Sequence, residues 1–211
     1  MNTSDPIIGP AYRILSPRLV IRCLEPKDAT MLSLAVKQSL EHLLPWMPWS
    51  KAEPIEFQER IQYLRKCRGK FDLGQDFTYG VFNPEESIFL GGTGLHTRLG
   101  EGAREIGYWI HIDYINQGIA TEVSAALTKV AFEVEHVSRV EIHCDPRNIR
   151  SASVPRKLGY IHEATLHNRI EDSPGNLRDS MIWTIFTEDY PTSPSAKTPI
   201  KAYDVIGRRI L

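Results

Sequence analysis

The chain has 211 residues with a formal net charge of −1, 42% hydrophobic residues and 24% charged residues, values typical of one globular domain with a buried core. The near-zero charge excludes strong electrostatic binding to nucleic acid or to a membrane surface, and no apolar run is long enough to span a bilayer. The three cysteines lack metal-binding spacing and their odd number argues against a disulfide framework; without a signal-peptide pattern, we expect a cytoplasmic protein with no metal.

Hydrophobic periodicity and turn residues predict alternating strands and helices after a loose lead-in at residues 1–15. Pro54 suits the first position of a helix. The expected elements are a strand at 19–24, a helix at 26–39, a loop at 42–54, a helix at 54–69, strands at 77–82, 87–99 and 104–112, a helix at 118–135, a strand at 139–144, a helix at 150–158, and strands at 160–169 and 178–187. This order predicts an α/β domain whose mixed, mostly antiparallel sheet carries helices on both faces.

The most informative segment is 105–121, EIGYWIHIDYINQGIAT, in which a strand runs through a polar turn into a helix that begins near Gly118. The first N–H groups of a helix have no intrahelical partner and the helix dipole adds positive charge there, so this joint is suited to hold a diphosphate. Gly118 and Ala120 let a ligand approach the backbone closely. The absence of GxxxxGK[ST] and GxGxxG argues against the common nucleotide and dinucleotide loops.

Several segments carry a family resemblance. INQGIA at 115–120 is similar to a pyrophosphate-loop signature, [RQ]-x-x-G-x-[GA], and HLLPWMPW at 42–49 and SPRLVIRCLEPKDA at 16–29 also have counterparts. A longer signature, N-x-x-S-x-x-V-x-x-K-L-G-[FY], is matched in full by Asn148, Ser151, Val154, Lys157, Leu158, Gly159 and Tyr160. Together these segments resemble the GNAT superfamily of acyl-CoA-dependent N-acetyltransferases, in particular the RimJ/RimL-like branch that acetylates N-terminal amines of ribosomal proteins.

The resemblance implies a single acetyltransferase domain over residues 12–190, followed by a linker and appendage at 191–211. It also implies that strands 104–112 and 139–144 splay apart so that the pantetheine arm of acetyl-CoA enters between them. The residues that it marks for the cofactor are Ile110, Ile112, Ile115, Asn116, Gln117, Gly118, Ile119, Ala120, Thr121, Asn148 and Ser151.

Two positions of the loop depart from the family pattern. Ile115 stands where the family has Arg or Gln, so one side-chain contact to phosphate is missing. Asn116 replaces a frequent glycine, and Asn tolerates left-handed backbone angles better than other non-glycine residues, so we expect the turn to form.

Acyl transfer from a thioester to an amine needs an amine that loses its proton and a thiolate that gains one. Glu105 resembles the family's glutamate that faces the acceptor, but an ordinary carboxyl pKa of about 4.3 makes a poor base unless burial raises it or water relays the proton. A solvated strand end is the alternative for Glu105. Ser151 resembles the serine near the cofactor sulfur and is the expected acid, with a helix cap as the alternative. His96, His143, Tyr79 and Tyr108 are weaker candidates for base or oxyanion donor.

Other polar and aromatic residues suggest ligand contacts. Asn148 can donate to and accept from pantetheine amides, or cap a helix. The tryptophans lie on a loop that prolines stiffen. They either line the binding site of the acceptor or pack under the loop as a small separate hydrophobic cluster. The expected acceptor contacts are His42, Trp46, Trp49 and Tyr79, and the basic residues near the 3′-phosphate of the cofactor are Arg147, Arg150, Arg156 and Lys157.

We therefore expect an acetyl-CoA-dependent N-acetyltransferase that acts by direct transfer on a primary amine, either a protein N-terminus or a small molecule. The alternatives are a non-catalytic acyl-CoA-binding sensor and an antibiotic-modifying acetyltransferase. The sequence indicates no nucleic-acid or membrane partner and does not distinguish a monomer from a homodimer.

Overall fold

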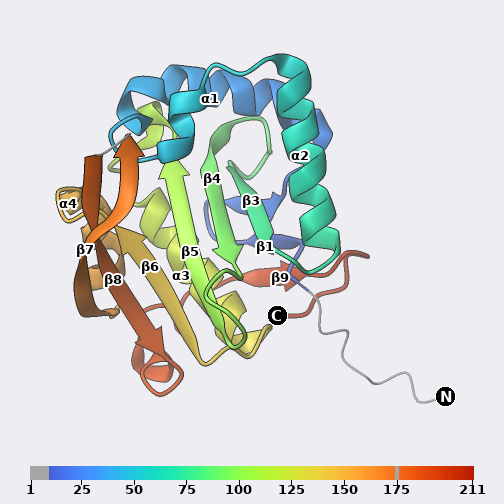
Figure 1. The fold of residues 1–211 in the computed structure, drawn as a ribbon. Coiled ribbons are helices and arrows are strands. Elements are labelled where there is room, and N and C mark those ends of the chain that lie inside the picture. The colour runs from blue at the N-terminus through green and yellow to red at the C-terminus, as the bar shows by residue number, and fades with distance from the viewer. Residues whose placement is uncertain (1–9, 174–175) are drawn as a thin grey trace.

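A nine-stranded sheet forms the centre of the computed structural model, which describes residues 10–173 and 176–211 (Figure 1). The strand order is β7-β8-β6-β5-β4-β3-β2-β1-β9, and every neighbouring pair is antiparallel except β5 with β6. The strands are β1 (Arg13–Leu15), β2 (Val20–Cys23), β3 (Phe77–Phe82), β4 (Phe89–His96), β5 (Ala103–Ile110), β6 (Arg139–Cys144), β7 (Ile161–Ser173), β8 (Asn176–Phe186) and β9 (Lys201–Tyr203). The expected mixed, mostly antiparallel sheet is confirmed.

Helices cover both faces of this sheet. They are α1 (Ala29–Leu43), α2 (Phe57–Asp72), α3 (Ile119–Glu133) and α4 (Ile149–Lys157), with short 3-10 turns at Pro26–Asp28, Pro48–Ala52, Ile112–Tyr114 and Tyr190–Thr192. On one face α1 and α2 bury Leu32, Val36 and Leu64 against Phe82 and Phe89. On the other face α3 buries an apolar stripe against β5 and β6, formed by Val123, Leu127, Val130, Ile106, Val140 and Ile142. The residues thus form two buried clusters, and Phe71 at the end of α2 belongs to the one that contains the α3 stripe.

The helix α2 begins later than the sequence predicts. Pro54 is not its first residue, because the helix starts at Phe57 with Glu56 as its N-cap. A capping box explains the shift: Glu56 and Glu59 each accept a hydrogen bond from the other's backbone N–H, which satisfies N–H groups that have no intrahelical partner. The expected helical start at Pro54 was therefore wrong.

The parallel strands β5 and β6 separate after a short paired region. Their register pairs Ala103 with Arg139, Arg104 with Val140, and Glu105 with Glu141, and it ends there although β5 continues to Ile110 and β6 to Cys144. Beyond this point β5 remains paired with β4, and β6 with β8. The splay expected from the family resemblance is therefore present as a gap in the middle of the sheet (Figure 1).

The C-terminal segment is part of the sheet and of the core. Residues 201–203 form β9, which pairs with β1, a strand that the sequence did not indicate. Lys129 of α3 donates from Nζ to the carbonyl oxygens of Ala196 and Thr198, so the expected linker lies against a helix. Part of the expected lead-in, residues 1–9, lies outside the described residues. Within the described ranges, no helix is both long and apolar enough to cross a lipid bilayer.

Candidate active site

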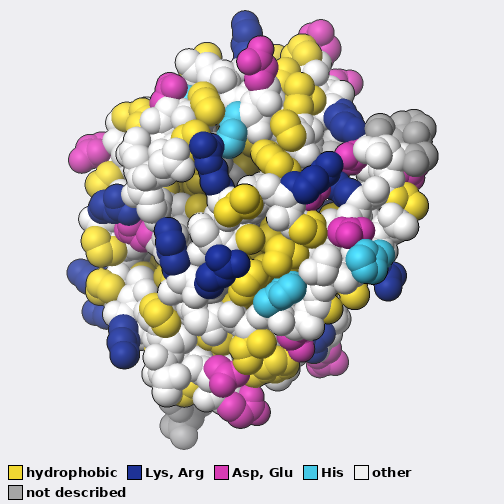
Figure 2. Space-filling view, turned by 90° about the vertical axis from the view of Figure 1, so that its left-hand side faces the viewer, with side chains coloured by type: hydrophobic (Ala, Val, Ile, Leu, Met, Phe, Trp, Pro, Cys, Tyr) yellow, Lys and Arg dark blue, Asp and Glu magenta, His cyan; other side chains and the backbone are white. Residues whose placement is uncertain are grey.

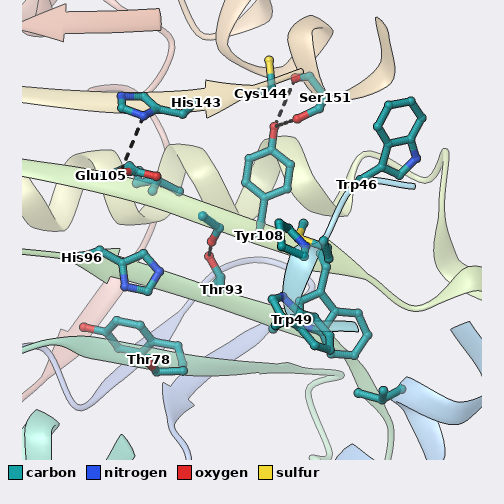
Figure 3. Close-up of a pocket in the computed structure, with 18 of the residues that line it drawn as sticks. Trp46, Trp49, Thr78, Thr93, His96, Glu105, Tyr108, His143, Cys144 and Ser151 are labelled. Atoms are coloured by element: carbon teal, nitrogen blue, oxygen red, sulfur yellow. Dashed lines mark hydrogen bonds and ion pairs between the residues drawn. The ribbon is translucent and has the colours of Figure 1, made fainter. Parts of the chain in front are cut away.

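A cavity of about 850 Å³ lies on the α1/α2 side of the sheet and reaches into the gap between β5 and β6. Its walls come from α1, the loop that follows α1, and the strands β4, β5, β6 and β8. Among the described residues that line it are Val36, Trp46, Trp49, Phe89, Thr93, Glu105, Tyr108, Trp109, His143, Cys144, Asn148, Ser151 and Arg178. The cavity thus brings together side chains that lie far apart in the sequence (Figure 3).

Ser151 and Tyr108 meet at the gap. The Tyr108 hydroxyl donates to the backbone oxygen of Ser151 at 3.1 Å and lies 3.1 Å from Ser151 Oγ (Figure 3). Burial raises the pKa of Tyr108, although the contact with Ser151 opposes this, so the phenol keeps its proton. The two hydroxyls form a short chain of proton donors beside the gap.

Asn148 begins the helix α4 and also faces the cavity. Its Oδ1 accepts from the backbone N–H of Ser151 at 3.0 Å, so Asn148 is the N-cap and Ser151 is not. This leaves the Ser151 hydroxyl free of the capping role that was its alternative. The Asn148 amide nitrogen donates to no residue in the described part of the chain. Asn148 can therefore cap α4 through its side-chain oxygen and contact a ligand through its side-chain nitrogen.

Cys144 ends β6 and lies next to Ser151 at the gap (Figure 3). Burial raises the pKa of Cys144 to about 11, against weaker opposing contacts with Ser151 and Trp183. The thiol is therefore protonated at neutral pH and is a poor nucleophile. This favours chemistry without a covalent enzyme intermediate.

Glu105 lies at the point where β5 and β6 separate, and Arg98 holds its charge. Arg98 Nε donates to Glu105 Oε2 at 2.7 Å, and a second guanidinium nitrogen binds Oε1. Burial alone would raise the pKa of Glu105, but the Arg98 hydrogen bond and the nearby His143 and Arg98 charges hold it below its usual range. A lowered pKa is the opposite of what a base for an amine requires.

His143 faces Glu105 across the gap from β6 (Figure 3). Its Nδ1 lies 3.7 Å from Glu105 Oε2, and its Nε2 lies 2.7 Å from Glu141 Oε2. Arg139 in turn donates from Nε to Glu141 Oε1 at 2.8 Å. His96, the other histidine of the cavity wall, bonds instead to Asp76 at 2.9 Å.

Aromatic side chains form the wall opposite the gap. Trp109 lies between Trp49 and Phe89, with ring centroids 6.0 and 5.9 Å away. Arg178 of β8 donates to the backbone oxygens of Pro45 and Trp46 at 3.1 and 3.0 Å, which fixes the tryptophan-bearing loop over the cavity. Trp46 and Trp49 therefore line the cavity from this loop.

Two expected acceptor residues have other surroundings. Tyr79 is completely buried and packs edge-to-face on Phe71, with centroids 5.0 Å apart, so its ring belongs to the core although the residue borders the cavity. His42 does not line the cavity. Burial and the nearby Arg150 charge lower the pKa of His42. We leave both out of the acceptor contacts proposed below.

The loop before α3 lies beyond the cavity, at the end of β5. Asn116 and Gly118 have φ values of 61° and 78°, so the expected left-handed turn is confirmed and the first N–H groups of α3 are exposed at one spot. The backbone N–H of Ile112 is already bound to Ser39 Oγ at 3.1 Å and is not free for a ligand.

Arg18 supplies a cation at this loop. Its guanidinium donates to the Gln117 carbonyl oxygen at 3.0 Å and pairs with Glu122, and Nη2 lies 3.5 Å from the place that a side chain on Gly118 would occupy. Arg18 lies in the turn between β1 and β2. It thus supplies a positive charge that the side chain of Ile115 cannot supply. With α3 it forms a site suited to phosphate.

The basic residues near α4 have mixed surroundings. All four are exposed, and two of them have partners: Arg147 is bound to Asp145 at 2.6 Å, and Arg156 lies over the Trp183 ring at 5.5 Å. Figure 2 shows Lys and Arg side chains beside exposed hydrophobic surface on the face of the molecule that carries α4, β7 and β8. This charge would favour an anionic ligand at the mouth of the gap.

Several functional residues were not indicated by the sequence. Successive side chains of a strand point to opposite faces, so Glu105, Gly107 and Trp109 of β5 share one face. This alternation in the sequence could have indicated that Trp109 lies on the same face as Glu105. His96 pairs with Glu105 in the β4–β5 hairpin. A prediction of this pairing could have indicated that Arg98, in the turn of the hairpin, lies near Glu105. Arg18 and Arg178 act across the fold, and no local pattern marks them.

The chain was compared with known proteins. A family model described as an acetyltransferase (GNAT) domain matches residues 18–161. The [ribosomal protein uS5]-alanine N-acetyltransferase of Escherichia coli is 25% identical over 86% of this chain and 94% of its own length. The uncharacterized N-acetyltransferase YnaD of Bacillus subtilis is 30% identical over 71% of this chain and 83% of its own. The structure of Mycobacterium smegmatis RimJ in complex with CoA-disulfide superposes with a TM-score of 0.73 at 22% identity, over 88% of this chain and 90% of that one.

Proposed function

This chain belongs to the GNAT family of acetyltransferases, and on that premise we propose that it acetylates the α-amino group at a protein N-terminus. The transfer of an acetyl group from acetyl-CoA to an amine nitrogen is the activity of the family. The choice of an α-amine rests on the lowered pKa of Glu105, which makes this carboxylate a weak base for an amine. The printed name of the Escherichia coli relative, an alanine N-acetyltransferase, agrees with this choice.

The proposed cofactor position follows the gap. The diphosphate lies on the N–H groups of residues 118–121 beside Arg18, and the pantetheine arm runs between β5 and β6 toward Ser151. The residues present fit acetyl-CoA. Gly118, with its left-handed φ, leaves room above the backbone for the diphosphate. Beyond Glu105 and Glu141, the edges of β5 and β6 that face each other are not paired, so their backbone groups are free for the pantetheine arm. Acetyl-CoA brings an activated thioester, so the enzyme needs only to position it and move protons.

Each proton then has a proposed carrier on this chain. Ser151 Oγ donates to the departing sulfur, and Tyr108, within 3.1 Å, can return a proton to Ser151. The ionised Glu105 attracts the acceptor's ammonium group to the other side of the gap. Trp46 and Trp49 line the entrance through which the N-terminal residues would pass.

The double role of Asn148 can be separated by substitution. Asn148→Ser keeps a side-chain oxygen for the cap and should change the free energy of unfolding little, whereas Asn148→Ala should cost about 1 kcal/mol. Both variants lose the amide donor, so both should bind acetyl-CoA more weakly. Urea unfolding and calorimetric titration measure the two effects; wild-type affinity in Asn148→Ser would reduce Asn148 to a cap.

The acceptor proposal is tested with two matched peptides of one sequence. One carries a free N-terminus and an acetylated lysine, and the other an acetylated N-terminus and a free lysine. An α-amine has a pKa of about 8 and a lysine about 10.4, so the lysine needs roughly 3.5 kcal/mol more to lose its proton at neutral pH. We expect the first peptide to react a few hundredfold faster, measured by thiol release and mass.

Faster reaction of the lysine peptide would contradict the proposed acceptor. Reaction with small primary amines and with neither peptide would place the acceptor among small molecules, as in an antibiotic-modifying enzyme. Both outcomes leave the family activity intact, because each still releases CoA.

A further inference from the structure

The imidazole of His143 stands between two carboxylates at the point where β5 and β6 separate. Nε2 lies 2.7 Å from Glu141 Oε2, and Nδ1 lies 3.7 Å from Glu105 Oε2. The His143 side chain keeps 24% of its surface exposed and lines the cavity, whereas the side chains of Glu105 and Glu141 are 8% and 10% exposed. Of the three groups, the imidazole is therefore the one most open to a ligand.

Glu141 fixes the tautomer of this imidazole. An ionised carboxylate only accepts hydrogen bonds, so the nitrogen that it faces must carry the proton. In the neutral ring Nε2–H then donates to Glu141, and Nδ1 presents its lone pair to the gap. Arg139 holds the other oxygen of Glu141 at 2.8 Å and so fixes the carboxylate itself. The ring has the orientation of a proton acceptor.

The charges around the ring are balanced. Arg98 pairs with Glu105 and Arg139 pairs with Glu141, so each carboxylate beside the ring has a cation of its own. His96 adds a further group near Glu105, and the register partner of His143 on β8 is the apolar Ile182.

The contact between His143 and Glu105 is incomplete without a third group. A separation of 3.7 Å is too long for a hydrogen bond, and with Nε2–H bound to Glu141 both facing atoms are acceptors. A donor with more than one N–H, placed between them, would satisfy both. An alkylammonium group has this chemistry.

We propose that His143 is the general base for the acceptor amine, with Glu141 as its positioning residue and Glu105 as the anchor of the ammonium group. The proposal deepens the function proposed above and rests on it for the acceptor, but the base is needed for any amine. It also gives a reason for the ion pair of Glu105: an anchor must stay ionised, and Arg98 keeps it so.

The proton balance is complete with the groups present. The ammonium nitrogen gives one proton to His143 Nδ1, which passes it to water, and the neutral nitrogen then bonds to the acetyl carbon. As the carbon–sulfur bond breaks, the sulfur takes a proton from Ser151 Oγ. The nitrogen loses its second proton to His143, which is neutral again, as the amide forms. Ser151 regains a proton through Tyr108 from water, so every group ends in its starting state.

His143→Gln tests the base. The Gln amide can still donate to Glu141 but cannot accept a proton at neutral pH. We expect kcat/KM for the acceptor to fall about a hundredfold at pH 7. The defect should shrink steadily as the pH approaches the pKa of the amine, which then loses its proton unaided. The KM for acetyl-CoA should change little.

Two further variants accompany it. His167→Gln changes a histidine on β7 whose side chain is 82% exposed and should match the wild type. Glu141→Gln removes the anion that favours the protonated ring, so the rising limb of the pH–rate profile should move to lower pH with a smaller loss of rate. This shift is measured even if His143→Gln fails to fold.

The proposal is overturned by a His143→Gln variant that stays within about threefold of the wild type, since a positioned base contributes at least a hundredfold. A loss of equal size at every pH also overturns it, because the residue would then act only on geometry. If the rising limb of the pH–rate profile does not move in Glu141→Gln, Glu141 has no part in the mechanism. None of these outcomes depends on whether an α-amine or a small amine is the better acceptor.

Discussion

Ser151→Ala is expected to lower kcat by about ten- to a thousandfold, near or below the range of positioned acids and bases. The substitution removes the hydroxyl that lies between the gap and Tyr108. It leaves the backbone N–H that Asn148 caps, so α4 should keep its stability. Affinity for acetyl-CoA should change little, and single-turnover rates together with calorimetric titration separate the two effects.

Ser153→Ala is the matched control, two residues further along α4. Its hydroxyl donates to the Arg150 carbonyl oxygen at 2.7 Å and does not line the cavity. We expect wild-type turnover from this variant. A Ser151→Ala protein that loses affinity while each bound complex turns over normally would make Ser151 a binding residue rather than an acid.

Gly118→Val is expected to abolish the thermal stabilisation that acetyl-CoA gives. A ligand present at a hundred times its Kd should raise the wild-type melting temperature by roughly 5–10 °C. The valine side chain would stand over the N–H groups of α3 and beside Arg18, where the diphosphate is proposed to lie. The variant should therefore melt at the same temperature with and without acetyl-CoA.

Backbone strain complicates this variant, because a β-branched residue is disfavoured at a φ of 78°. Gly207→Val provides a control with the same strain, since Gly207 also has a φ of 78° and has open space around it. Both variants should be destabilised without ligand, but only Gly118→Val should lose the shift. Equal shifts in both would remove the loop from the cofactor site.

Elements with a clear period were predictable from the sequence. The bounds of β3 at 77–82 and β6 at 139–144 agree with the prediction, because apolar residues continue to the strand ends and turn residues follow. The apolar stripe along α3 predicted both ends of this helix to within two residues. The short strands β1 and β9 pair over a separation of nearly the whole chain, and three residues carry too little pattern to be recognised.

The electrostatics of the site could not be predicted in the same way. Glu105 was a natural candidate for a base by position, but its protonation depends on Arg98, which reaches it only through the β4–β5 hairpin. His143 gained its significance from Glu141, two residues earlier, and from Glu105 on the neighbouring strand. Residue types were visible in the sequence, whereas the charges beside them came from the fold.

The gap between β5 and β6 would make the stability of the protein depend on bound acetyl-CoA. Only three residue pairs join these strands, so a bound acetyl-CoA would supply contacts that a continuous sheet would otherwise provide. At a hundredfold excess over its Kd, a ligand stabilises a folded protein by about 2.7 kcal/mol and lowers its unfolded fraction about a hundredfold. When acetyl-CoA is scarce, more molecules unfold and reach the proteases, so the abundance of the enzyme would follow the supply of its own substrate.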